Sequence, residues 1–188
     1  MDFELSAEQQ ELRAAVRAFA REELNHDLEA RDHEGTFPRD CWLKCAEFGL
    51  LGLPVPSEYG GQGQDLVTTT IAMEALGWGC RDNGLVFSLN AQMWAVQMPI
   101  VHYGTEEQKR HWLPKLLSGE IVGAHAITEP GAGSDVFSLT SRAEQREGGY
   151  VLNGQKTFST NSPVAGLALA FAYVQRENQK PALTAFLV

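Results

Sequence analysis

Apolar residues recur at the spacing of amphipathic helices through the first two thirds of the chain. Ser6 followed by Gln9 has the pattern of a helix-capping box, so a first helix is predicted to begin there. Its apolar face is formed by Leu12, Val16, Phe19, Ala20 and Leu24. A longer buried helix is expected further along, where the apolar residues Leu85, Leu89, Met93, Val96 and Ile100 are three or four positions apart.

Proline and glycine set the limits of two more predicted helices. One of them is bracketed by Pro38 and Gly49. Residues 54–65 contain two prolines and three glycines, so they are expected to form a loop. A further helix is predicted after this loop, over residues 67–76.

The pattern changes near residue 121. A final helix is predicted to begin at Thr105, where Gln108 completes a second capping box, and to break at Pro114. Beyond it, strands are predicted over 121–128, 138–143, 150–152, 156–160, 167–175 and 183–188, with a hairpin turn at 146–149. The chain is therefore predicted to be α+β. An all-helical N-terminal domain, residues 1–121, would be followed by the first part of an antiparallel β-barrel or sandwich domain, residues 122–188.

Charge and composition narrow the classes of function. The 188 residues carry a formal net charge of −9, and the sequence shows no Lys/Arg cluster, which argues against nucleic acid or an anionic membrane surface as the main partner. The N-terminus resembles neither a signal nor a transit segment, and no apolar run has membrane-spanning length. A cytoplasmic protein without membrane insertion is therefore expected.

The cysteines and histidines do not have the spacing of a metal site. Cys41 and Cys45 are one helical turn apart, but Cys80 is distant, so structural thiols and no bound metal are expected. The odd number of cysteines favours a reducing compartment. The histidines are scattered and are expected to be structural or solvated rather than catalytic; they are His26, His33, His102, His111 and His125.

Residues 127–135 read Ile-Thr-Glu-Pro-Gly-Ala-Gly-Ser-Asp and form the most specific motif of the chain. The Pro-Gly-Ala-Gly-Ser stretch leaves the backbone almost free of Cβ atoms, so successive N–H groups can converge on a phosphate. Its spacing matches neither a P-loop nor the Gly-x-Gly-x-x-Gly dinucleotide fingerprint. Considered alone, Asn153-Gly154 would be a hairpin turn, and Thr128 and Thr160 would be ordinary strand threonines.

A second motif, Asn-Gly-Gln-Lys-Thr-Phe-Ser-Thr-Asn at residues 153–161, gives the pair a family resemblance. The two motifs resemble the acyl-CoA dehydrogenases, which carry Thr-Glu-Pro-Gly-Ala-Gly-Ser-Asp and then Asn-Gly-x-Lys-x-Trp-Ile-Thr-Asn. Residues 54–61, 103–109 and 113–116 resemble other family segments in the expected order, so the resemblance covers essentially the whole chain. It implies a helical N-terminal domain and part of a middle β domain, without the family's C-terminal helical bundle.

The resemblance also implies a flavin adenine dinucleotide (FAD) cofactor on the β domain. The flavin ring would be contacted from both motifs, and the phosphate and pantetheine side would be bound at the glycine-rich turn. The cofactor-binding residues would be Ile127, Thr128, Gly133, Ser134, Phe158, Ser159 and Thr160, with Ser134 also binding substrate. A threonine hydroxyl near flavin N5 can donate a hydrogen bond to the atom that gains hydride.

Some positions depart from the family pattern. Phe158 stands where tryptophan is common, which keeps an aromatic wall but removes an indole N–H. His125 and Ser159 are expected to make the ring pocket more polar. Glu129 is expected to be an exposed turn carboxylate, Asp135 a turn or cap residue, and Lys156 a solvated charge on a strand. No catalytic role is expected for any of the three.

The resemblance implies FAD-dependent α,β-dehydrogenation of an acyl thioester, from acyl-CoA to trans-2-enoyl-CoA. In most members the α proton is removed by a glutamate of the C-terminal bundle, so no catalytic residue is assigned and the chain alone is expected to be inactive. Two alternatives stay open: a dehydrogenase of an acyl or aminoacyl thioester on a carrier protein, and a non-catalytic partner subunit of a split dehydrogenase. The expected partners are an electron-transfer acceptor and either a homo-oligomer or a chain supplying the C-terminal region.

Overall fold

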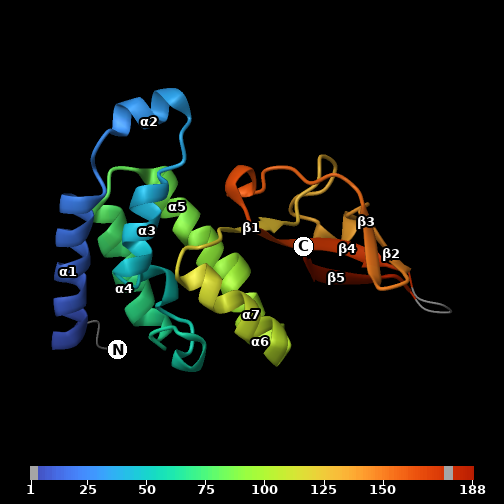
Figure 1. Ribbon diagram of the computed structural model, residues 1–188, viewed down its shortest axis with the longest axis horizontal. Helices are drawn as coiled ribbons and strands as arrows, with labels where there is room; N and C mark the ends of the chain where they lie inside the picture. Colours follow the sequence, from blue (N-terminus) through green and yellow to red (C-terminus); the bar gives the residue numbers. More distant parts are fainter. Residues whose placement is uncertain (1–3, 176–179) are drawn as a thin grey trace. The chain divides into compact units, whose positions relative to one another are not determined.

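The computed structural model describes residues 4–175 and 180–188, and its elements fall into two compact units that divide between Ile121 and Val122 (Figure 1). The first unit is helical and the second is built on a β-sheet. Among the residues that the structure describes, no helix is both long and apolar enough to cross a membrane.

The first unit contains seven α-helices among its described residues. They are α1 (Ala7–Glu23), α2 (Leu28–Glu34), α3 (Arg39–Glu47), α4 (Leu66–Gly79), α5 (Asn83–Gln92), α6 (Met98–Tyr103) and α7 (Glu106–Leu117). Short 3₁₀ turns, η1 (Leu50–Gly52) and η2 (Ser57–Tyr59), shape the loop before α4. The core is closed by fully buried side chains, among them Trp42, Leu76, Leu89, Met93 and Leu116, each contributing about 1.5–3 kcal/mol by burial.

Both predicted capping boxes are confirmed. In α1 the Ser6 hydroxyl accepts from the Gln9 N–H at 3.1 Å, and the Gln9 side chain accepts from the Ser6 N–H at 3.1 Å. Thr105 and Gln108 make the same reciprocal pair at the start of α7. The predicted break at Pro114 is wrong, because α7 continues through it to Leu117. Burial of the last-turn leucines offsets the roughly 3 kcal/mol cost of an internal proline.

The long helix predicted around residues 85–100 is interrupted by a π-helical turn. The turn, η3 (Met93–Gln97), lies between α5 and α6, and the Met98 N–H donates to the Met93 carbonyl five residues earlier. Pro99 follows directly and has no N–H for the carbonyl of Ala95, so the widened turn absorbs the register change. The apolar spacing still identified the buried face, since Leu85, Met93 and Ile100 are all buried.

Helix α2 had no signal in the apolar pattern, because none of its residues is buried. It is delimited by two residues in left-handed backbone conformation, Asp27 with φ 52° and Gly35 with φ 64°. The Gly35 N–H donates to the carbonyls of Arg31 and Asp32, which ends the helix.

The second unit is a mixed sheet centred on one strand. Its strands are β1 (Gly123–Ala126), β2 (Arg142–Arg146), β3 (Gly149–Asn153), β4 (Leu167–Val174) and β5 (Ala182–Leu187). Strand β4 pairs in parallel with β1 and with the start of β2, and antiparallel with β5. Strands β2 and β3 form the predicted hairpin. The α+β class is confirmed, and the sheet is mixed rather than purely antiparallel.

The sheet curls across its width. At Tyr173, strand β4 pairs with Arg142 of β2 and with Leu183 of β5, so these two strands flank it and β3 lies beyond β2. The rings of Tyr150 on β3 and Phe186 on β5 nevertheless meet edge to face, with centroids 5.2 Å apart. Because strands in a flat sheet are about 4.8 Å apart, this contact requires the sheet to bend towards closure.

The strand predicted at 156–160 is wrong, and the one predicted at 138–143 begins too early. Residues 154–161 form an irregular segment in which Phe158 has φ 54° and Asn161 has φ 71°, values that do not fit a strand. The 3₁₀ turn η4 (Val136–Ser138) precedes β2, which starts only at Arg142. Asn153-Gly154 is not a hairpin turn either, because no strand follows directly.

Gly154 is required by close packing rather than by a turn. Its φ is 156°, and a Cβ added there would collide with the Cα, Cβ and Oγ of Ser141 at the start of β2. We therefore expect Gly154→Ala to lower the free energy of unfolding by at least about 2 kcal/mol, measured by urea unfolding. Gly149→Ala is the matched control, since a Cβ at Gly149 meets nothing within 4 Å. Equal stability of the two variants would contradict this account.

Candidate functional site

The glycine-rich motif forms an open turn at the end of β1. The Glu129 N–H donates to the Ala132 carbonyl at 2.9 Å, and the Ala132 N–H returns a bond to the Glu129 carbonyl at 3.1 Å. Beyond this turn, Gly133 and Ser134 are exposed. A Cβ at Gly131 or Gly133 would meet no atom within 4 Å, so the glycines are not required by internal packing. They leave bare backbone facing open space, where an anion can approach the N–H groups.

The turn is anchored by the side chain of Glu129, which is only 2% exposed. Its carboxylate accepts hydrogen bonds from the Thr140 N–H at 2.6 Å, the Thr140 hydroxyl at 2.7 Å and the Ser141 N–H at 2.9 Å. Lys156 adds an ion pair, with Nζ 2.8 Å from the carboxylate. The expectation of an exposed turn carboxylate is therefore wrong. Glu129 satisfies backbone donors that would otherwise lie unpaired before β2.

The pKa of Glu129 is held well below its ordinary value. Burial by itself raises the pKa of a carboxyl group, but hydrogen bonds from Lys156, Ser141 and Thr140 to the charged form outweigh burial and lower it. Glu129 is therefore ionised at neutral pH, and its oxygens are occupied by donors. This residue cannot act as a proton acceptor in catalysis.

Lys156 joins the two motifs. Its ammonium donates to the Ile127 carbonyl at 3.0 Å as well as to Glu129. Next to it, the Thr157 N–H donates to the Thr128 carbonyl at 2.9 Å. Lys156, which was expected to be solvated, is therefore half-buried and bonded to the first motif. The two segments singled out from the sequence lie side by side. Both are predicted site segments, 127–128 on one side and 158–160 on the other.

The second motif presents an aromatic ring to solvent. Phe158 is 91% exposed and its backbone is left-handed, with φ 54°. Asn161 anchors the segment to β1, because its side chain is buried and donates from Nδ2 to the Gly123 carbonyl at 3.1 Å. Between them, the Ser159 hydroxyl is buried without a hydrogen-bond partner among the described residues. The segment therefore offers a ligand an exposed aromatic ring and, next to it, a hydroxyl without an internal partner.

Two further predicted positions have structural partners. The His125 ring on β1 packs edge to face on Phe171, with centroids 5.3 Å apart, and burial lowers its pKa, which favours the neutral imidazole. Asp135 accepts from the Phe137 N–H and from the Ser138 hydroxyl, so it caps η4 as a turn residue. Neither residue is placed as a general base.

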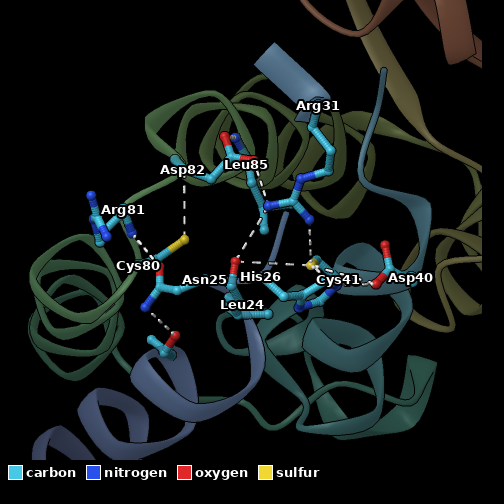
Figure 2. A network of polar contacts seen from close by, with 11 residues as sticks. Leu24, Asn25, His26, Arg31, Asp40, Cys41, Cys80, Arg81, Asp82 and Leu85 are labelled. Atoms are coloured by element: carbon cyan, nitrogen blue, oxygen red, sulfur yellow. Dashed lines mark hydrogen bonds and ion pairs between the residues drawn. The ribbon is translucent and has the colours of Figure 1, made fainter. Parts of the chain in front are cut away.

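A polar network in the helical unit is shown in Figure 2. Arg31 lies at its centre, with Nη1 3.1 Å from the Cys41 sulfur and Nη2 3.3 Å from Asp82 and 3.4 Å from the Leu24 carbonyl (Figure 2). Asp82 also caps α5 by accepting from the Leu85 N–H. The guanidinium thereby ties the ends of α1 and α2 to the starts of α3 and α5.

The same network contains a trio of metal-ligand type that cysteine spacing did not reveal. His26 Nε2 lies 2.7 Å from Asp40 Oδ2, and the Cys41 sulfur is 3.8 Å from each of them. Burial raises the pKa of the Cys41 thiol, although Arg31 opposes this effect. A cation bound to the sulfur would also meet the guanidinium 3.1 Å away. The trio is therefore best described as part of the helix-packing network.

Comparisons with known proteins place this geometry in context. A family model described as "Acyl-CoA dehydrogenase, N-terminal domain" matches residues 6–120, and "Acyl-CoA dehydrogenase, middle domain" matches residues 124–188. The L-prolyl-[peptidyl-carrier protein] dehydrogenase of Pseudomonas fluorescens is 44% identical over 100% of this chain and 49% of its own length. The mitochondrial short-chain specific acyl-CoA dehydrogenase of Rattus norvegicus is 36% identical over 98% of this chain and 44% of its own length.

Solved structures agree with these matches. The prolyl acyl carrier protein oxidase AnaB superposes with a TM-score of 0.93 at 44% identity, covering 98% of this chain and 49% of that one. The FAD complex of PigA superposes with a TM-score of 0.92 at 36% identity, covering 100% of this chain and 49% of that one. The chain therefore spans about half the length of the relatives it matches. The family resemblance seen in the sequence is confirmed.

The Glu129 anchor generates a pH-dependent prediction. Removing the charge in Glu129→Gln should lower the free energy of unfolding by about 3 kcal/mol at neutral pH, because a buried ammonium loses its partner. The folded-state pKa of Glu129 lies below the ordinary value of 4.5. Its stabilisation is therefore fully present above pH 4.5 and lost as the pH falls towards the folded-state pKa.

The stability difference between the wild type and Glu129→Gln should accordingly shrink as the pH is lowered below 4.5, when urea unfolding is followed at each pH. Glu144→Gln serves as the control, since its pair with Arg146 is exposed on both sides and should contribute little. A difference that stays constant across this pH range would argue against the assignment.

Proposed function

This chain belongs to the acyl-CoA dehydrogenase family, and we propose that it forms the FAD-binding part of an enzyme that dehydrogenates an acyl thioester between Cα and Cβ. The observation that carries the proposal is the pairing of the two motifs by Lys156, which leaves the Phe158 ring and the bare turn at Gly133 accessible. The two features expected of an FAD site, an aromatic wall and a phosphate-binding turn, thus come from two segments of the β unit that Lys156 ties together.

The residues present fit such a cofactor. The exposed turn around Gly133 and Ser134 has space for an anionic diphosphate at its backbone N–H groups. Phe158 provides an aromatic face, and the unpaired Ser159 hydroxyl is a buried hydrogen-bonding group without an internal partner. The residues that would hold FAD are Ile127, Thr128, Gly133, Ser134, Phe158, Ser159 and Thr160, with Ser134 also next to the pantetheine arm of the substrate.

When bound, FAD supplies the hydride acceptor for the Cβ–H bond. The chain's own contribution is to position the cofactor and the substrate and to exclude water from between them. The Thr128 backbone is held at the second motif by the Thr157 N–H, and the exposed Phe158 ring would cover an apolar face of the bound cofactor. These groups hold the reacting partners in place without taking up a proton.

The proton acceptor is proposed to come from outside this chain's described residues. Both carboxylates of the glycine-rich motif are already engaged: Glu129 by Lys156 and the β2 backbone, and Asp135 by its own turn. Since a general base needs a free lone pair within reach of the substrate, neither qualifies. The base would be supplied by the region corresponding to the other half of the relatives, in the same chain or in a partner subunit.

Two substrate classes present the same thioester. A coenzyme A thioester and a carrier-bound thioester share the phosphopantetheine arm, so Ser134 does not distinguish between them. The second class is favoured by the relatives that stand at 44% and 36% identity, both described as L-prolyl-[peptidyl-carrier protein] dehydrogenases. We therefore propose a carrier-bound aminoacyl or acyl thioester as the favoured substrate and an acyl-CoA as the alternative. If no partner restores turnover, the chain would instead be a non-catalytic subunit of a split enzyme.

The assembled enzyme is further proposed to be cytoplasmic, to associate as a homo-oligomer or with a second chain, and to pass electrons to an electron-transfer acceptor. A structural neighbour titled "Electron transferring flavoprotein of Acidaminococcus fermentans: Towards a mechanism of flavin-based electron bifurcation" supports the last point, with a TM-score of 0.91 at 34% identity.

The cofactor assignment is tested by flavin retention. The purified chain is mixed with FAD, excess cofactor is removed by gel filtration, and the visible absorbance of the protein peak is recorded with its elution volume. Retained flavin supports the site on this half of the protein. Loss of all flavin, both from the chain alone and after mixing with the complementary half of a relative, would refute it.

Phe158→Ala should weaken FAD binding by about tenfold, because an aromatic contact contributes about 0.5–1.5 kcal/mol beyond area burial. The measurement is a titration of FAD fluorescence on binding. Tyr103→Ala is the control, since Tyr103 is 89% exposed on α6 and belongs to neither motif. Equal FAD affinity of the two variants would remove Phe158 from the site.

A further inference from the structure

A cationic groove lies on the helical unit, where the sequence had shown no cluster of basic residues. Arg13, Arg17 and Arg21 follow one another at every fourth position of α1, and Trp78 near the end of α4 faces them. The groove has a volume of about 440 Å³ and is also lined by Gln10, Ala14 and Ala18. Four-residue spacing on a helix places the three guanidinium groups on one face.

The helix packing fixes the position of Trp78 against α1. Gly79 lets the two helices approach, because a Cβ at that position would lie 2.8 Å from both the Ala20 Cβ and the Arg17 carbonyl oxygen. Asn25 holds the contact by donating from Nδ2 to the Gly79 carbonyl at 2.9 Å. The groove is thus built by the fold rather than by a flexible side chain.

Two arginines stack on the same indole. The guanidinium carbons of Arg17 and Arg21 lie 4.4 Å and 4.2 Å from the Trp78 ring, which is still 55% exposed. Arg13 has a distant pair with Glu74 at 3.8 Å, whereas no carboxylate pairs with Arg17 or Arg21 in the part of the chain that the structure describes. Cation–π contacts hold the two guanidinium planes but leave their outward N–H donors available for carboxylates.

We infer that this groove docks the carrier protein that delivers the thioester, through carboxylates beside an apolar side chain on an acidic surface. The inference rests on the proposed function and names its partner. A chain with a net charge of −9 repels an acidic protein over most of its surface, so association requires a local positive patch. Arginine and tryptophan are also the residues that most often dominate protein interfaces.

The exposed indole favours a protein over a free anion. A small phosphate would be bound by the guanidinium groups alone and would leave the apolar ring in water. A protein surface provides both carboxylates for Arg17 and Arg21 and an apolar contact for Trp78. Binding at this groove would therefore distinguish a carrier-bound substrate, which brings a protein surface, from coenzyme A, which brings none.

The first test measures binding of a fluorescently labelled, acidic peptidyl carrier protein in its apo form by anisotropy. The double variant Arg17→Gln/Arg21→Gln should weaken binding at least about tenfold and flatten its salt dependence. The matched control Arg110→Gln/Arg146→Gln also removes two charges, from arginines paired elsewhere with Glu106 and Glu144, and should bind as the wild type does. Trp78→Ala should weaken binding, and Trp78→Phe should restore most of it.

Three outcomes of this test would overturn the inference. They are no binding by the wild type, equal loss in the control pair, and displacement of the carrier by millimolar inorganic phosphate without any effect of Trp78→Ala. Folding of each variant is checked by its urea midpoint, both for the test variants on α1 and α4 and for the control variant on α7 and β2.

A second test separates docking from catalysis. The full enzyme, with the complementary half present, is assayed with prolyl thioester on the carrier protein and with the same acyl group on free pantetheine. Arg17→Gln/Arg21→Gln should raise KM for the carrier-bound substrate about tenfold, leave kcat unchanged, and leave both constants unchanged for the pantetheine substrate. If neither thioester is oxidised, the proposed function fails while the binding result still stands. If KM rises for both substrates, the docking role is refuted.

Discussion

A buried ion pair between Glu129 and Lys156 supports the candidate site. It joins the turn that ends β1, the backbone that begins β2 and the second motif, three segments with no continuous hydrogen-bonded ladder between them. Taking both charges out of water is costly, and the arrangement is stable because several donors converge on one carboxylate. The candidate site is therefore held together by polar contacts, while the apolar core of the unit lies along β4.

Interactions between residues close in the sequence could be predicted from it, and interactions between distant residues could not. The capping boxes at Ser6 and Thr105 involve residues three positions apart, so both helix starts could be predicted. The two motifs that the sequence singled out are hydrogen-bonded to each other in the structure. The Glu129–Lys156 pair spans 27 positions, and isolated charges are ordinarily solvated, so nothing in the pattern indicated their burial. Phe158 and Thr160 have strand-favouring side chains, but left-handed backbone at Phe158 and Asn161 overrides that propensity.

The arginines of α1 show a related limit. Along the sequence, Arg13, Arg17 and Arg21 are separated by apolar residues and flanked by Glu11, Glu22 and Glu23, and the chain as a whole carries a net charge of −9. Helical periodicity gathers them on one face, and the packing of α4 brings Trp78 under two of them. Total charge thus describes the average field around a protein but not the field at a particular groove. Family membership accounts for the fold and the two motifs, whereas the arginine groove follows from the packing of α1 against α4.

The left-handed backbone at Phe158 has a consequence for the kinetics of ligand capture. A non-glycine residue in this region costs on the order of 1 kcal/mol, and the chain holds it there through the Asn161 contact with Gly123. The aromatic ring is consequently presented in solvent before any ligand arrives. A flat ligand would then bind to an aromatic surface that is already formed, without a prior rearrangement of the loop. Its association rate would be set by diffusion and orientation rather than by folding of the site.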